Sequence, residues 1–203
     1  AADLVITSPA AIDADYLARA ELAGLESAQT FGFPTVALAG EEGRSLSIVN
    51  AVSDGYPLRG KVRISDQLFG QSYVTDSIPE PGTAWAEPGL MARLDADVGD
   101  TIRLGSAVFR LTHVLEFRPD QSMGFLSLAP AIVVHIDDVA AMEVVRPGSR
   151  VTYRQLFAGA PEDVETFKKA IDEQLGAEEQ LRTVDDASEQ IAAAIDRARR
   201  FLT

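Results

Sequence analysis

Residues 85–105 read Trp85-Ala-Glu-Pro-Gly-Leu-Met-Ala-Arg-Leu-Asp-Ala-Asp-Val-Gly-Asp-Thr-Ile-Arg-Leu-Gly105, and the run Val108-Phe-Arg-Leu-Thr-His-Val-Leu115 follows soon after. The Pro-Gly pair opens a short helix, because proline is well tolerated in the first turn of a helix. A Gly-Asp turn ends that helix, and strand-like runs lie on both sides of Gly105. This order predicts a small unit rich in β-strands, with one short helix.

The chain before this unit has a β-α-β-β pattern. Residues 4–7 predict a strand, and residues 13–25 predict a helix with Ala18, Leu22 and Leu25 on one face.

Residues 31–39 are apolar except for Pro34, which favours an edge strand or a bulge at that point. A turn at residues 41–43 leads into a further strand over residues 46–52.

Proline and glycine are frequent between residues 56 and 82, where strand signals are weak (62–64 and 72–75). We therefore expect residues 61–82 to form a connector with surface loops. The next unit, residues 83–148, contains a continuous apolar run over 131–136 that predicts a strand buried on both faces.

Residues 108–117 alternate between apolar and polar side chains, as a half-buried strand requires. The apolar side of this predicted strand carries Phe109, Leu111, His113, Leu115 and Phe117.

The end of the chain has a β-α-β-α pattern. A strand over residues 150–157 precedes a helix that begins at Pro161 and ends near Gly176. A short strand (181–184) and a last helix (about 187–202) follow. The two helices carry their apolar faces at Val164, Phe167, Ile171 and Leu175, and at Ile191, Ile195, Ala198 and Leu202.

Composition narrows the possible functions. The 203 residues are 46% hydrophobic, which is ordinary for a globular protein, and the net charge of −13 without a basic cluster argues against nucleic acid as a partner. The absence of cysteine excludes disulfides and thiolate chemistry. No apolar run approaches the roughly 20 residues that span a bilayer.

The order of features in residues 85–115 resembles the β-rich subdomain in the extracytoplasmic loop of ABC-transporter permeases of the FtsX/MacB/LolC-LolE class. Residues 51–60 and 128–130 carry the same resemblance. It implies an α+β fold, in which both chain ends (1–60 and 149–203) build a porter-like, ferredoxin-like α/β sandwich. The connector (61–82) and the inserted β-rich subdomain (83–148) interrupt that sandwich.

The resemblance also implies a function without catalysis. The domain would lie on the periplasmic side of the bacterial inner membrane, between transmembrane helices of the parent permease. A separate cytoplasmic ATPase subunit would drive it, and it would pair with a second permease copy or half. Its task would be mechanotransmission, with a hydrophobic or lipid-linked cargo or a periplasmic partner protein. The last helix, with Ile191, Ile195 and Leu202, would be the lever.

The sequence contains two histidines, which are its candidate catalytic or metal-binding groups. His113 lies on an apolar strand face, which favours a core histidine, whereas His135 precedes Asp137 and Asp138. A His-Asp pair is compatible with acid-base catalysis or half a metal site. The alternative function is therefore a freestanding soluble α+β enzyme or binding protein with its site around His135 and Asp137.

Other motifs are weaker. Asp95, Asp97 and Asp100 do not have the spacing of a calcium loop, and Asp100 after Gly99 is typical of a turn. The sequence has no Walker phosphate loop and no Gly-x-Ser-x-Gly nucleophile elbow. We therefore predict no catalytic, cofactor-binding or metal-binding residues.

A loop-like segment carries large apolar residues. They fill the core of the β-rich unit, or they contact a partner protein or lipid-like cargo. The same question applies to Tyr56 and Phe69. The residues of the segment are Met123, Phe125, Leu126 and Leu128.

Overall fold

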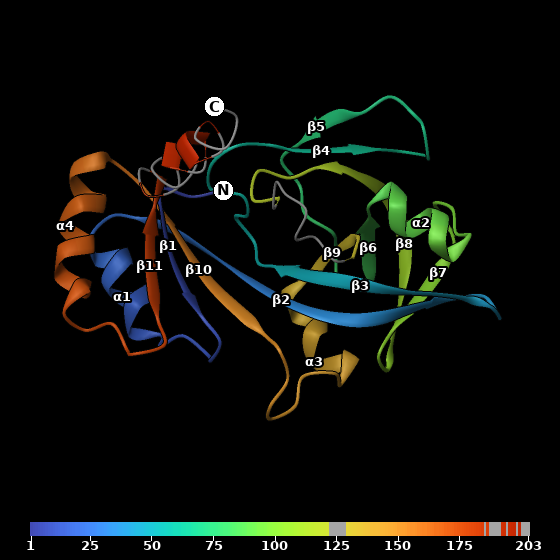
Figure 1. Ribbon diagram of the computed structural model, residues 1–203, viewed down its shortest axis with the longest axis horizontal. Coiled ribbons are helices and arrows are strands. Elements are labelled where there is room, and N and C mark those ends of the chain that lie inside the picture. Colours follow the sequence, from blue (N-terminus) through green and yellow to red (C-terminus); the bar gives the residue numbers. More distant parts are fainter. Residues whose placement is uncertain (122–128, 185, 187–191, 194, 198, 200–203) are drawn as a thin grey trace.

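The computed structural model describes residues 1–121, 129–184, 186, 192–193, 195–197 and 199. Its strands form one continuous mixed sheet, and helices lie beside it (Figure 1). The predicted α+β class is therefore confirmed. Among the described residues, no helix is both long and apolar enough to cross a lipid bilayer.

One end of the sheet is a four-stranded antiparallel layer made from both ends of the chain. Leu4 pairs with Phe157 on one side and with Thr183 on the other, so the first strand lies between two late strands. The order in this layer is β11 (Gln180–Thr183), β1 (Leu4–Ser8), β10 (Thr152–Ala158) and β2 (Glu26–Ala39).

Two helices cover one face of this layer, α1 (Asp15–Leu22) and α4 (Pro161–Asp172) (Figure 1). Helix α4 buries Phe167 and Ile171 against the sheet, as its periodicity predicts. The prediction for helix α1 is wrong in its end and in its buried face. It ends at Leu22, which is exposed, and it buries Tyr16 and Ala20 instead.

The physical reason is a turn. Gly24 has φ +77°, a left-handed conformation that suits glycine. The helix therefore stops before Leu25, which is buried from beyond the helix end. The predicted face of Ala18, Leu22 and Leu25 assumed one helix through this turn.

The rest of the sheet closes on itself as a barrel. Its circle of pairings runs from β2 through β3 to β9, β6, β8 and β7, and β7 returns to β2. The strands that join β2 are β3 (Gly43–Val52), β9 (Ala131–His135), β6 (Thr83–Ala86), β8 (Ala107–Phe117) and β7 (Thr101–Leu104). The prediction that residues 131–136 form a strand buried on both faces is confirmed over β9.

Apolar side chains from every barrel strand fill the interior. Helix α2 (Pro88–Leu94) adds Leu90, Met91 and Leu94 to this core, so the Pro-Gly start predicted for this helix is confirmed. Residues in the left-handed region follow the ends of two short elements, Asp95 after α2 and Gly105 after β7.

Strand β2 belongs to both parts of the molecule. Its first half pairs with β10 as far as Gly32, and its second half pairs with β7 from Ala37. Pro34 lies in the gap between these two partners. Ile48, its partner on β3, donates its N–H to Pro130 on the β9 side. The nitrogen of Pro34 therefore faces the gap. This agrees with the predicted edge position, because proline has no N–H to donate to a neighbouring strand.

The segment 61–82 contributes two strands, β4 (Val62–Ser65) and β5 (Tyr73–Thr75), as the weak strand signals predict. Strand β4 pairs with β8, so this segment is part of the sheet. The barrel also takes β2 and β3 from the first 60 residues. The division of the chain into independent units remains a prediction.

Strand β8 departs from simple alternation. Its pairing with β6 skips Thr112, and its pairing with β4 skips Glu116. Each β-bulge reverses the faces of the residues that follow it. The predicted common face is therefore wrong beyond Leu111, because Val114 enters the barrel core while Leu115 packs outside the barrel and Phe117 is exposed.

Candidate functional site

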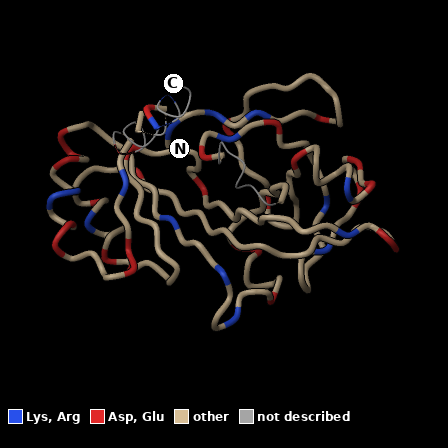
Figure 2. The backbone as a smooth tube through the Cα atoms, viewed as in Figure 1, with Lys and Arg blue, Asp and Glu red and all other residues tan. Residues whose placement is uncertain are grey.

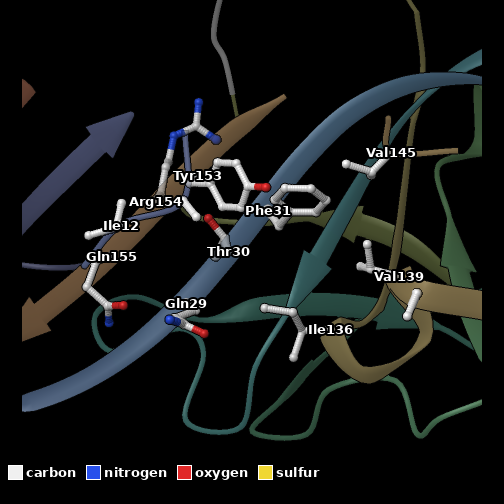
Figure 3. Close-up of a pocket in the computed structure, with 12 residues that line it drawn as sticks. Ile12, Gln29, Thr30, Phe31, Ile136, Val139, Val145, Tyr153, Arg154 and Gln155 are labelled. Atoms are coloured by element: carbon white, nitrogen blue, oxygen red, sulfur yellow. The ribbon is translucent and has the colours of Figure 1, made fainter. Parts of the chain in front are cut away.

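An open cleft of about 410 Å³ lies between the antiparallel layer and one end of the barrel (Figure 3). One wall is formed by β2 and β10. The other is formed by the short helices η1 (Ile136–Asp138) and α3 (Val139–Met142) and the chain that follows them. The volume is within the range of small-molecule sites, roughly 300–1,000 Å³.

The register of β2 and β10 sets the chemistry of the first wall. Phe31 is opposite Tyr153, and Gln29 is opposite Gln155, so all four side chains lie on the same sheet face. The rings of Phe31 and Tyr153 are 4.5 Å apart between centroids. The Gln155 amide donates to the Ala28 carbonyl at 3.0 Å, which fixes its orientation.

The opposite wall is aliphatic. It is lined by Ile136, Val139, Ala140 and Val145, and Ile12 closes the side next to the helical layer. Arg154 is also at the rim, but its guanidinium points away from this wall (Figure 3). Burial lowers the pKa of Arg154 below its usual value. The cleft therefore offers an apolar surface with few polar groups, which suits an apolar ligand or segment.

His135 caps η1 beside this cleft. Its Nδ1 accepts the Asp137 N–H at 3.1 Å, so Nε2 carries the proton of the neutral ring. Nε2 lies 3.5 Å from Oδ1 of Asp54, a long contact. The His135 side chain is only 9% exposed, whereas that of Asp54 is 94% exposed.

These groups do not form a catalytic constellation. His135 lies near two exposed carboxylates, Asp54 and Asp137, and no serine or threonine hydroxyl is hydrogen-bonded to its ring within the described part of the chain. The same part contains no group of three or more His, Asp or Glu side chains placed to hold a metal ion. The observed role of His135 is to cap the start of η1.

His113 is half-buried at the outer side of the barrel, edge-on to Trp85 at 5.6 Å. Its Nε2 lies 3.7 Å from Asp66 Oδ1, and its Nδ1 is buried with no hydrogen-bond partner among the described residues. The expectation of a satisfied core histidine is therefore wrong, because the bulge at Thr112 turns His113 out of the barrel interior.

The aspartates near residue 97 form a turn, as predicted. The Asp97 N–H donates to Asp100 Oδ2 at 2.9 Å, and Asp95 is the left-handed residue at the end of α2.

The two connector aromatics differ. Tyr56 is buried and donates its hydroxyl to Asp120 at 2.5 Å. Burial, followed by the Asp120 carboxylate, raises the pKa of Tyr56. Phe69 is fully exposed in a left-handed turn.

Several predicted contact residues lie outside the described residues. Of the proposed lever positions, Ile195 is described, and it is helical and 49% exposed. The positions outside the described residues are Met123, Phe125, Leu126, Leu128, Ile191 and Leu202.

The cleft itself was missed in the sequence, because four separate segments build it. A signal was present in the sequence. Gln29 and Phe31 are two residues apart, as are Tyr153 and Gln155, so each strand carries one amide and one aromatic side chain on the same face.

Comparison with solved structures identifies the fold. The periplasmic region of MacB from Actinobacillus actinomycetemcomitans superposes with a TM-score of 0.58, at 10% identity, over 94% of this chain and 92% of that one. The extracellular domain of the noncanonic ABC-type transporter YknZ from Gram-positive bacteria gives 0.56, at 9% identity, over 89% and 100%. The fold is that of the extracytoplasmic domains of MacB-type ABC permeases, and the predicted resemblance is confirmed.

At the sequence level, the chain is 28% identical over 202 residues to YbbP of Escherichia coli K12, an uncharacterized ABC transporter permease. The match covers all of this chain and 24% of the relative, so the chain spans about a quarter of that permease. No protein-family model matches the sequence.

Proposed function

We propose that this chain is the extracytoplasmic domain of an ABC transporter permease, on the periplasmic side of the bacterial inner membrane. The observation that carries this proposal is the match of the whole chain to one quarter of the permease YbbP. The MacB-like fold of the same residues supports it.

In this proposal the domain transmits movement and performs no catalysis. A cytoplasmic ATPase subunit hydrolyses ATP, and transmembrane helices of the parent permease pass the motion to this domain and to a paired permease copy or half. These 203 residues contain no Walker motif, so the proposal places ATP hydrolysis outside them. Such coupling needs an element with two arrangements.

The last helix is the proposed lever. Thr183 and Asp186 hold its beginning by reciprocal hydrogen bonds, in which each backbone N–H donates to the side chain of the other. Ile195 further along is half exposed, which leaves it available to a neighbouring element.

The layer that precedes the proposed lever supports this role. The order β11-β1-β10-β2, with α1 after β1 and α4 after β10, is the order of a ferredoxin-like sandwich interrupted between β2 and β10. We assign the porter-like part to this layer. The lever helix follows β11, which pairs with β1 in the same layer.

The cleft is the proposed place for a hydrophobic or lipid-linked cargo. Its walls are largely apolar, and they come from the two parts of the domain, so a movement of one part against the other changes its width. The alternative of a soluble enzyme at His135 has less support, because Asp54 and Asp137 are exposed and no nucleophile is hydrogen-bonded to the ring among the described residues.

The test uses the parent permease with its ATPase in lipid vesicles. Spectroscopic labels on Ile12→Cys and Val139→Cys report the width of the cleft while ATP is supplied. We expect Ile195→Pro to abolish the ATP-dependent change in label separation, because proline breaks a helix interior. ATP turnover should persist.

The matched control is Ile195→Ala, which keeps the helix and should keep the movement. An unchanged label response in the well-expressed Ile195→Pro variant would exclude the lever. An absence of any ATP-dependent response in the wild type would exclude the coupling function.

A further inference from the structure

The outer surface of the barrel carries an exposed face with an unusual composition. It is formed where β3, β2, β7 and β8 lie side by side, and we call it the arginine–aliphatic face. Its residues are Val36, Leu38, Arg44, Leu46, Arg103, Val108 and Arg110.

The register brings these side chains together. Arg44 pairs with Leu38, Leu38 pairs with Arg103, and Arg103 pairs with Val108. Directly paired residues point to the same side of a sheet. One line across four strands is therefore Arg-Leu-Arg-Val, and the neighbouring pair Val36–Leu46 extends it with further aliphatic surface.

The four aliphatic side chains of this face are between 41% and 55% exposed. The residues that alternate with them, such as Ala37, Leu104 and Phe109, are fully buried inside the barrel. The inner face thus supplies the packing of these strands, and the outer aliphatic groups are free for contact.

The three arginines have no carboxylate partner within the part of the chain that the structure describes. None of Arg44, Arg103 and Arg110 makes an ion pair or a side-chain hydrogen bond with any residue that the structure describes. Glu41 and Glu42 lie at the tip of the same hairpin without pairing to them. This occurs in a chain of net charge −13, whose acidic residues lie both around α4 and at the barrel end that carries the β2–β3 hairpin (Figure 2).

From this juxtaposition we infer that the arginine–aliphatic face binds a segment of another protein in which carboxylates alternate with aliphatic residues. Arginine is enriched in protein interfaces whereas lysine is depleted, and this face has three arginines and no lysine. A guanidinium holds a carboxylate through two parallel hydrogen bonds, which fixes the position of the segment.

Two other occupants fit less well. Surfaces that bind membranes combine lysine or arginine with inserted aromatic groups, and this face carries no Trp, Tyr or Phe. A second copy docked through the same face would oppose arginine to arginine, which is unfavourable.

The test starts with a random library of short linear peptides, selected on the chain and counter-selected on the Arg44→Glu/Arg103→Glu variant. We expect the enriched peptides to contain both acidic and aliphatic residues. Their affinity, measured by fluorescence polarisation, should fall about tenfold or more in that variant and in Leu38→Ser. The affinity should weaken as ionic strength rises.

Arg146→Glu is the matched control, since Arg146 is an exposed arginine outside this face, and it should keep the wild-type affinity. Arg103→Lys should bind more weakly than wild type, because lysine cannot form the two parallel hydrogen bonds to a carboxylate. If a glutamate variant lowers the melting temperature, the neutral Arg103→Gln takes its place.

Four results would overturn the inference. They are a selection without acidic–aliphatic peptides, an equal affinity for wild type and the glutamate variant, binding to phosphatidylglycerol vesicles that the same variant abolishes, and self-association that it abolishes. The third result would assign the face to a membrane, and the fourth to a second copy. None of them bears on the proposed coupling to ATP, which is measured in the whole transporter.

Discussion

Val5 of β1 and Arg182 of β11 are cross-strand partners, although they lie near opposite ends of the chain. The distance between paired Cα atoms in an antiparallel ladder suits a disulfide. The chain has no cysteine of its own that could form an alternative disulfide. We expect Val5→Cys/Arg182→Cys to form a disulfide on oxidation and to stabilise the fold by about 2–4 kcal/mol. Mass spectrometry and thermal melting check this. Val5→Cys/Gln180→Cys is out of register and should remain reduced.

Gly105 and Gly40 provide a matched pair. Both have left-handed backbones, with φ of +58° and +59°. A Cβ on Gly105 would lie 2.1 Å from the Met142 carbonyl oxygen, whereas one on Gly40 would meet nothing within 4 Å. Gly40→Ala should therefore cost only the backbone strain of roughly 1–2 kcal/mol, and Gly105→Ala more than about 3 kcal/mol. Urea denaturation gives both values, and similar losses would contradict the close approach at Gly105.

The start of the last helix should depend on pH. Hydrogen bonds from the Thr183 N–H and hydroxyl lower the pKa of Asp186. A carboxylate with a lowered folded pKa stabilises the fold above its unfolded pKa of about 3.9. This contribution is lost as the pH falls through the lower folded pKa. Asp186→Asn should speed amide exchange around Val184 at neutral pH, and the difference from wild type should vanish in strong acid.

Glu178→Gln is the control for that experiment, because Glu178 is an exposed acid outside the cap. A pH-independent difference between Asp186→Asn and wild type would show that the Asp186 charge does not hold the helix start.

The bulge at Thr112 sets which side chains of β8 enter the barrel. Its deletion should turn Val114 outward and Leu115 inward, since a shift of one residue exchanges the two faces. We expect a loss of about 3 kcal/mol or more, whereas Thr112→Ala should cost under about 1 kcal/mol. The single tryptophan, Trp85, pairs with His113 beside the bulge, so its fluorescence reports unfolding. A stable deletion variant with native fluorescence would refute the bulge as a determinant of register.

Local patterns predicted most of the elements. The Pro-Gly start of α2 and the apolar run of β9 each follow from short-range preferences, and both are confirmed. Two failures share one cause. The extra residue in β8 and the early end of α1 at Gly24 both interrupt a periodic structure. The apolar residues in the sequence nevertheless keep the same spacing beyond each interruption.

The cleft could not be predicted in the same way. It depends on Phe31, Val139 and Tyr153 meeting across long sequence separations. The register of β10 on β2 brings Phe31 to Tyr153, whereas Val139 follows β9, which pairs with β3. The sequence places His135 beside Asp137, but it gives no sign of the distant neighbour Asp54, which reaches His135 only because β3 pairs with β9.

Strand β2 gives backbone hydrogen bonds to the antiparallel layer in its first half and to the barrel throughout its second half. Neither part therefore keeps a complete ladder if the other unravels. A strand shared in this way makes two regions one cooperative unit. Heating should consequently melt the described layer and barrel in a single transition, and amide exchange at Phe31 and Val36 should be limited by the same global opening.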